Sequence, residues 1–352
     1  MIRTFAFWIL VIAAAAQTTE NAALEGLDPV LLTQGKEEPG KDSITVHHGL
    51  FLYRFASPQT RDRFLKDPAR FAIQLDGACA RMGAPVVGLP DSYYVYDGRI
   101  YIFGSADCYK AFTANPKQYL ESEQPNVPWN PTSAERRQGR KLLEEALAAM
   151  GGGANWNKIR SYSETRQVTT GPNVVTERTT ARLPGSFVRL TKNGKLQFGQ
   201  LVSPSSALRF AGDQTFPEPQ SFSKTLLADL KTSIVPLLLD RNASGFDCYY
   251  SGRQDGMDRL EINEDGIRRT LLINPDSHRI DGMLWRSRGP SGFNDFRSRY
   301  SDFRETGGLV LPFQVEIGVE DQPGRSRSFH VESYDWNPTD IDARLSASTR
   351  LP

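Results

Sequence analysis

Apolar and polar side chains alternate along most of the chain from Trp156 to the C-terminus. A period of two is the pattern of strands that bury one face. Alternating segments occupy residues 159–168, 173–183, 186–202, 246–253, 258–275, 278–288, 296–305, 309–319 and 328–337. Many strands at short spacing, with little helix between them, predict an α+β protein built on a large antiparallel sheet, strongly curved or half-barrel in form.

Turn and helix signals divide this region. The dipeptides at 193–194 and 265–266 are Asn-Gly and Asp-Gly, which favour the positive φ angles of tight hairpins. One helix, over 223–241, is predicted to interrupt the strands. Another opens the region, with Ser133 as its cap, an apolar face, and the glycines at 151–153 as its end.

The N-terminal third contains a repeat, in which residues 49–71 correspond to residues 98–119. Phe55 aligns with Phe103, Ser57 with Ser105, Phe64 with Phe112, Pro68 with Pro116, and Phe71 with Tyr119. Each copy predicts two short aromatic strands, joined at His48-Gly49 or Asp97-Gly98, and then a serine-capped helix that runs to a proline. We expect two small β-hairpin/helix units.

The first unit carries short motifs in a fixed order. They are "DPV" at 28–30, "FAS" at 55–57, "RDRF" at 61–64, "DPARF" at 67–71 and "DGACA" at 76–80. This order resembles the YHS domain family, with the first unit at about 26–82 and a shorter second unit at 83–120. A polar, proline-rich stretch at 121–132 reads as a linker.

The second unit is similar to the metal-binding relatives of the YHS family, which carry a Cys-x-x-Met-Gly segment and a cysteine at a helix start. Cys79, Met82 and Cys108 occupy those places, while Gly104 stands where the relatives have a further cysteine. The resemblance implies that these three residues are metal ligands, with the His47-His48 pair as further candidates. Thiolate and thioether ligands suit copper(I), and thiolates also suit zinc.

Two other states of these cysteines stay open. Cys79 and Cys108 could form a disulfide in an oxidising compartment, or both could be free thiols in the core. The third cysteine, Cys248, lies in a predicted strand and is the odd thiol of the set. Three cysteines are too few for a disulfide-stabilised scaffold.

The larger region also carries motifs that occur in order. They are "AMGG" at 149–152, "INPDSHRIDGM" at 273–283, "RYSDFRETGGLVLPFQVEI" at 299–317 and "DWNPTDID" at 335–342. Residues 133–346 thereby resemble the LolA/LolB-like group of outer-membrane lipoprotein-sorting proteins. The resemblance implies a concave sheet face, closed by helices, that holds an apolar group such as an acyl chain. Alternatively, the sheet has an ordinary filled core.

Candidate ligand-contacting residues come from the apolar segments of three predicted strands. They are Leu272, Trp285, Val310 and Phe313. Apolar side chains at alternate positions of a strand can line one sheet face, so we expect these residues to contact an apolar ligand.

The N-terminus predicts export. Arg3 precedes an apolar run that ends in three alanines at 14–16, which is the pattern of a signal peptide spanning residues 1–16. The apolar run is too short for a stable membrane span, and no later segment reaches spanning length. We expect a periplasmic or secreted mature protein without a transmembrane segment.

Basic and acidic residues number 42 and 41, without a basic block, so the sequence does not indicate nucleic-acid binding.

Catalytic motifs are absent from the sequence: it contains no His-Glu-x-x-His, Gly-x-Ser-x-Gly or phosphate-binding Gly-x-x-x-x-Gly-Lys. We therefore expect that the protein is not an enzyme. The leading hypothesis is an exported, non-enzymatic binding protein for a lipid or a lipoprotein acyl chain, with a YHS-like accessory module. The alternatives are a periplasmic protein that handles copper or zinc through its YHS-like cysteines, and an adaptor that binds other envelope proteins through its sheet edges.

Overall fold

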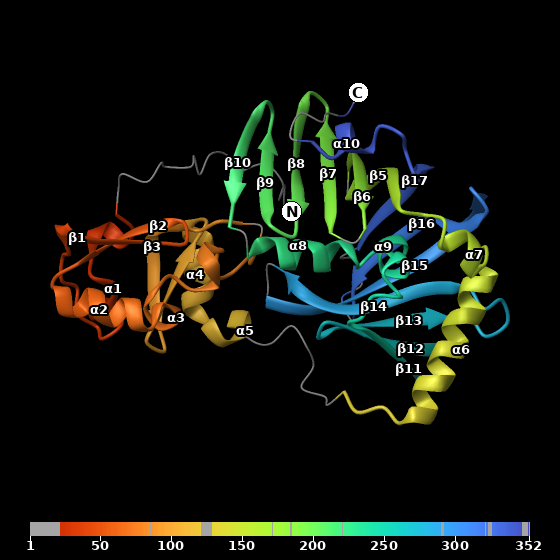
Figure 1. Cartoon of the computed structure of the whole chain (residues 1–352), viewed down its shortest axis with the longest axis horizontal. Coiled ribbons are helices and arrows are strands. Elements are labelled where there is room, and N and C mark those ends of the chain that lie inside the picture. Colours follow the sequence, from red (N-terminus) through yellow and green to blue (C-terminus); the bar gives the residue numbers. More distant parts are fainter. Residues whose placement is uncertain are drawn as a thin grey trace, which may run out of the picture. The chain divides into compact units, whose positions relative to one another are not determined.

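The computed structural model describes residues 22–84, 86–120, 129–170, 172–183, 185–219, 221–289, 292–320, 322, 326–346 and 351, so the predicted signal peptide lies outside the described residues. The chain forms two compact units, Met1–Glu121 with Pro290–Gly292, and Ser122–Gly289 with Phe293–Pro352. We call them the N-terminal unit and the C-terminal unit (Figure 1). No helix among the described residues is both long and apolar enough to cross a membrane.

Two β-hairpins form the frame of the N-terminal unit. Strand β1 (Lys41–His48) pairs with β2 (Phe51–Phe55), and β3 (Leu89–Tyr96) pairs with β4 (Arg99–Phe103), as two separate two-stranded sheets. Gly49, Asp97 and Gly98 have φ angles of +60°, +49° and +65°. The two predicted hairpins and their turns are confirmed.

A capped helix follows each hairpin, as the repeat predicts. Ser57 precedes α2 (Pro58–Lys66), and its Oγ accepts a hydrogen bond from the Thr60 N–H at 3.2 Å. Ser105 precedes α4 (Ala106–Ala114) and accepts from the Cys108 N–H at the same distance. The remaining short elements are η1 (Leu24–Gly26), α1 (Pro29–Leu32), α3 (Pro68–Phe71), η2 (Leu75–Gly77) and α5 (Pro116–Leu120).

The C-terminal unit is built on one antiparallel sheet of thirteen strands, in the order β10-β9-β8-β7-β6-β5-β17-β16-β15-β14-β13-β12-β11. The strands are β5 (Ser161–Thr170), β6 (Asn173–Arg182), β7 (Ser186–Asn193), β8 (Leu196–Ser203), β9 (Ser206–Ala211), β10 (Gln214–Glu218), β11 (Phe246–Gln254), β12 (Met257–Glu264), β13 (Ile267–Ile273), β14 (Ile280–Gly289), β15 (Gly292–Thr306), β16 (Leu309–Val319) and β17 (Ser326–Trp336). The predicted large antiparallel sheet is confirmed. The hairpin of β9 and β10 was not predicted.

The C-terminal unit also contains helices, and two of their features differ from the sequence-based prediction. Helix α6 (Ser133–Ala149) is capped by Thr132 rather than by Ser133, because Thr132 and Glu135 form a reciprocal capping box. The single helix predicted over 223–241 is two helices, α8 (Phe222–Leu230) and α9 (Ile234–Leu239). Pro236 explains the break, since its ring would clash with the carbonyl four residues earlier in a continuous helix. The short helices α7 (Gly153–Trp156) and α10 (Ile341–Arg344) complete the unit.

Helix α8 reveals how strongly the sheet curves. The Asp229 carboxylate on this helix pairs with Arg189 of β7 at 3.1 Å, and the neighbouring Ala228 carbonyl accepts from Arg269 of β13 at 2.8 Å. Six strands separate β7 from β13 in the sheet order. Both can meet one helix only because the sheet bends around it (Figure 1). We call the face that carries Arg189 and Arg269 the inner face, and the opposite one the outer face.

Candidate functional site

Two of the four predicted ligand-contacting residues lie on the inner face. Trp285 is directly opposite Arg269 in the β13–β14 ladder, so both side chains are on the same side of the sheet. The inner face extends from β7 to β17 through successive cross-strand partners, which are Arg189, Thr179, Glu164 and Tyr334. Phe313 packs edge-on against Tyr334, with ring centroids 5.6 Å apart.

The structure places the other two residues on the outer face. Leu272 is three residues from Arg269 along β13 and faces Gly282 across the ladder. Val310 is three residues from Phe313 along β16. Because side chains alternate along a strand, an odd separation puts them on opposite faces. The structure therefore brings Trp285 and Phe313 to one face and leaves Leu272 and Val310 on the other.

The inner face carries apolar side chains that are only half-buried. Phe296 stacks on Trp285 with ring centroids 5.6 Å apart, and its cross-strand partner is Val319. Val315 and Ile317 continue the row along β16, and all four of Phe296, Val315, Ile317 and Val319 keep partial solvent contact. We call these four residues the apolar row. A run of accessible apolar side chains on a sheet face that curves around a helix is a surface suited to an apolar ligand.

A buried charged cluster lies beside the apolar row. The Arg166 guanidinium bridges Glu164, at 3.2 Å, and Glu177, and it stacks over the Phe329 ring at 4.3 Å. Burial raises the pKa of Glu164. At Glu177 burial also acts to raise the pKa, but the charges of Arg166 and Arg189 and the hydrogen bond from Arg166 together outweigh it and lower the pKa of that carboxyl. These charges satisfy one another, so the cluster is a structural element of the inner face.

Arg327 differs from the other inner-face arginines. It stands directly opposite Ile317 in the β16–β17 ladder, and its guanidinium is 5.1 Å from the centre of the Phe329 ring. The side chain is exposed, yet partial desolvation lowers its pKa. Among the described residues, Arg327 has no carboxylate within ion-pair distance. Solvent therefore reaches a cation that stands between Ile317 and Phe329.

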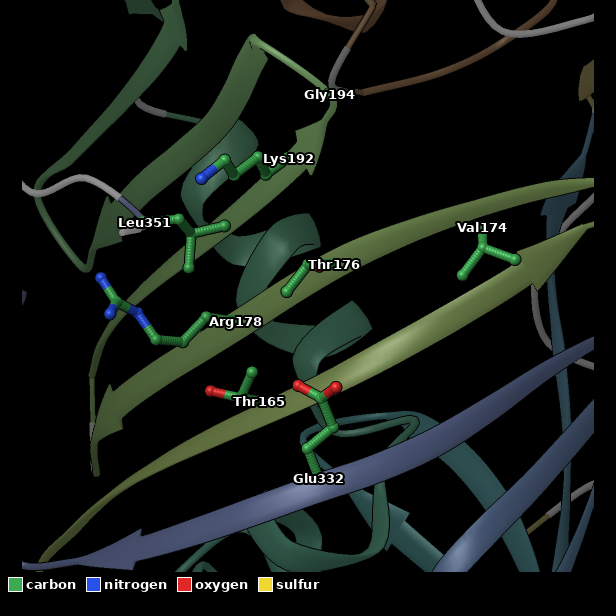
Figure 2. Close-up of a pocket in the computed structure, with 8 residues that line it drawn as sticks. All are labelled: Thr165, Val174, Thr176, Arg178, Lys192, Gly194, Glu332 and Leu351. Carbon is green, nitrogen blue, oxygen red and sulfur yellow. The ribbon is translucent and has the colours of Figure 1, made fainter.

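The outer face carries a groove of about 400 Å³ (Figure 2). Its lining comprises Thr165, Val174, Thr176, Arg178, Lys192, Gly194, Glu332 and Leu351. Most of these side chains are hydroxyl or charged groups, and the groove lies on the side opposite Glu164 and Arg166 because its strand residues alternate with them. A polar groove of this kind suits an apolar chain less well than the apolar row does.

The two cysteines of the N-terminal unit lie together. The Cys79 thiol is fully buried and donates a hydrogen bond to Cys108, which is 7% exposed at the first turn of α4. This bond, with help from Ser105 and Arg81, lowers the pKa of Cys108 to about 6, while the same bond and burial raise the pKa of Cys79. Both sulfurs are free thiols in the structure. The arrangement is a close dithiol whose outer member favours the thiolate.

The donor set around this dithiol is small. Met82 packs against the same buried cluster as Cys79 and Cys108, whereas His47 and His48 belong to β1, where His48 packs against Phe64. Over the described parts of the chain, no three or more His, Cys, Asp or Glu residues group together as ligands. Three sulfur atoms fall short of the four ligands of a structural zinc site and match copper(I) better.

Cys248 is separate from this pair. It is a fully buried residue of β11 in the C-terminal unit, and burial raises the pKa of its thiol to about 11. A buried neutral thiol of this kind is inert.

Sequence reasoning missed the apolar row and the charged residues beside it. The available signal was the alternation in β5, where Glu164 and Arg166 occupy the same phase as Tyr162 and Val168. When charged residues occupy the same alternate positions of a strand as buried apolar residues, they indicate an internal ion-pair cluster or a polar ligand site. Arg327 has the same phase relation to Phe329.

Comparisons with known proteins give a distant structural likeness. Three crystal structures align with the chain: a DUF1329 family protein from Desulfovibrio piger, a putative outer membrane lipoprotein-sorting protein domain from Vibrio parahaemolyticus and a LolA superfamily protein from Nitrosomonas europaea. Their identities are 10%, 10% and 12%, and their TM-scores are 0.39, 0.38 and 0.39. The alignments cover 60%, 60% and 59% of this chain and 97%, 98% and 97% of those chains.

No protein-family model matches the chain, and no curated protein matches it. At these identities and TM-scores, we take no function from the three structures.

Proposed function

We propose that the chain is an exported, non-enzymatic binding protein whose C-terminal unit holds the apolar chain of an acyl lipid against the inner face of its sheet. This is the kind of function that the LolA/LolB-like resemblance of residues 133–346 implies. The YHS-like resemblance of residues 26–120 stays a prediction. The observation that carries the proposal is the apolar row, because its four side chains are accessible on the face that curves around α8.

The apolar row is the right chemistry for such a ligand. Each methylene that leaves water contributes about 0.8 kcal/mol, so ten methylenes contribute about 8 kcal/mol, the free energy of a micromolar complex. Immobilising the acyl chain on the protein costs entropy, so the net binding free energy is smaller than this value. Of the sequence-predicted contacts, Trp285 and Phe313 belong to the proposed site, whereas Leu272 and Val310 do not.

Lipid analysis of the whole protein tests the proposal. The protein is purified from its envelope fraction without detergent, extracted with organic solvent, and titrated with a fluorescent fatty acid. We expect either a co-purifying acyl lipid or saturable probe binding at about one site per chain. Finding neither would favour a sheet with an ordinary filled core and contradict the proposal.

A second candidate function rests on the dithiol. The contact between Cys79 and Cys108, with Met82 in the same cluster, supports copper(I) uptake by the N-terminal unit. Reduced protein is titrated with copper(I) against a chromogenic chelator under nitrogen. We expect one equivalent per chain and its loss in Cys108→Ser, with Cys248→Ser as the matched control. Equal uptake by all three proteins would exclude the dithiol as the site.

A further inference from the structure

Arg327 gives the proposed lipid site a polar end. We propose that its guanidinium binds the anionic head group, a carboxylate or a phosphate, of an amphiphile whose chain lies on the apolar row. This inference rests on the proposed function and adds the class of ligand to it. It therefore predicts selection between amphiphiles that share one chain and differ only in the charge of the head.

Charge pairing on the inner face singles out this residue. Arg166 is held by Glu164 and Glu177, and Arg189 is held by Asp229. Three other cations near α8 and α9 are also paired with carboxylates: Arg209 with Glu218, Lys231 with Asp240 and Glu264, and Arg269 with Glu264. Arg241, which follows α9, is instead held by the Leu238 carbonyl and the Asn157 side chain. Arg327, by contrast, has no carboxylate partner among the described residues.

Position links this charge to the apolar row. Arg327 and Ile317 are direct cross-strand partners, and Val315 is the partner of Phe329, two residues further along β17. Side chains that face each other across an antiparallel pair are in contact range. A chain packed on Ile317 and Val315 would therefore have its head beside the guanidinium.

The chemistry favours an anion over a neutral head. A guanidinium presents parallel N–H donors that match two oxygens of a carboxylate or a phosphate. Glu177 and Asp229 attract Arg327 through space, while Arg166 and Arg189 repel it. An anion that reaches the guanidinium gains a charge-assisted pair with a cation that has already lost part of its hydration.

Matched ligands test the proposal in the full-length protein. Oleate, oleyl phosphate and oleyl alcohol have the same chain, and each displaces a neutral fluorescent probe at pH 8 below its critical micelle concentration. We expect at least one of the two anions to bind about tenfold or more tightly than the alcohol, which is the effect of a hydrogen bond to a charged group. Preference for oleate alone or for oleyl phosphate alone identifies the head group.

Three variants make the assignment specific to Arg327. Arg327→Gln should remove the preference for the anion and leave the affinity for oleyl alcohol unchanged, and Arg327→Lys should keep part of the preference. The control is Arg299→Gln, an exposed arginine of β15 opposite Glu316 on the outer face, which should behave as wild type.

The failures of the two proposals are distinguishable. Equal binding of all three ligands by the wild type, or equal effects of Arg327→Gln and Arg299→Gln, would overturn the role of Arg327 and leave the lipid site standing. Failure to bind any of the three ligands would overturn the lipid site, and the head-group assignment with it.

Discussion

Ile317 and Arg327 face each other across the β16–β17 ladder on the inner face of the sheet. An aliphatic side chain and an exposed guanidinium thus share one edge of the proposed site. A ligand could make both polar and apolar contacts there. The apolar row continues along β16, and the guanidinium groups of Arg327 and Arg166 both contact the Phe329 ring. Substitution of either residue of this pair changes the proposed site at a single position.

Ile317→Asp should weaken binding of a fluorescent fatty acid about tenfold or more. The new carboxylate would have to be desolvated by the bound chain, and it would attract Arg327 away from an anionic head. The matched control is Val174→Asp, a β6 residue that is 56% exposed on the outer face and should leave the affinity unchanged. Thermal unfolding of both variants verifies that the fold is intact. Equal loss of affinity in the two variants would argue against an inner-face site.

Glu218 should make stability depend on pH. Its carboxylate is buried beside Arg209, at 3.4 Å, and burial raises its pKa to about 7 from a usual value of 4.5. Between these two pH values the folded protein holds the proton and the unfolded chain releases it. The free energy of unfolding therefore falls as the pH rises from about 4.5 to 7.

Glu218→Gln removes this titration. We expect the variant to be more stable than wild type at pH 8, by roughly 1–3 kcal/mol, and similar to it at pH 5. Urea unfolding at both pH values measures the difference, and Glu316→Gln, at an exposed position of β16, serves as the control. A difference between Glu218→Gln and wild type that is the same at pH 5 and pH 8 would mean that Glu218 does not titrate in this range.

Gly139 sets the approach of α6 to β11. A Cβ atom at this position would lie 2.5 Å from the Cα of Tyr249, a backbone atom that cannot move aside cheaply. Gly139→Ala should therefore destabilise the protein by about 1–3 kcal/mol, although alanine is the better helix former. Gly153→Ala, in open space at the start of α7, should be neutral or stabilising. The midpoints of urea unfolding give both values, and a neutral Gly139→Ala would mean that this helix contact is looser than described.

Cys79 and Cys108 should behave as a pair towards an oxidant. Oxidised glutathione takes two electrons and two protons from the dithiol, which forms one disulfide and leaves two reduced glutathione molecules. Thiol counts on denatured protein should fall from three to one, with Cys248 remaining, because it is buried in the other unit. A count that stays at three would show that the two thiols cannot reach bonding geometry.

Much of the fold could be predicted from local signals. Asp97-Gly98 and the serine caps specify backbone conformations within a few residues, and period-two alternation specifies strands wherever one face is buried. The hairpin of β9 and β10 escaped prediction because Pro217 weakens its strand signal. Proline is tolerated there because β10 is the last strand of the sheet.

The candidate site was less accessible to prediction. Val310 and Phe313 are both apolar, but their separation of three residues cannot place them on one face of a regular strand, and only the register shows which one faces α8. The pairing of Arg166 with Glu177 joins neighbouring strands, and the lack of a carboxylate partner at Arg327 among the described residues appears only when the nearby carboxylates are placed. Such relations are tertiary, and no local pattern encodes them.

Photo-crosslinking tests the central claim most directly. The full-length protein is loaded with a fatty acid that carries a diazirine in its chain, irradiated, and mapped by peptide mass spectrometry. We predict labels on β15 and β16 at Phe296, Val315, Ile317 or Val319, competed away by excess oleate. Labels confined to the outer groove around Val174 and Leu351, or labels that excess oleate does not reduce, would contradict an acyl site on the inner face.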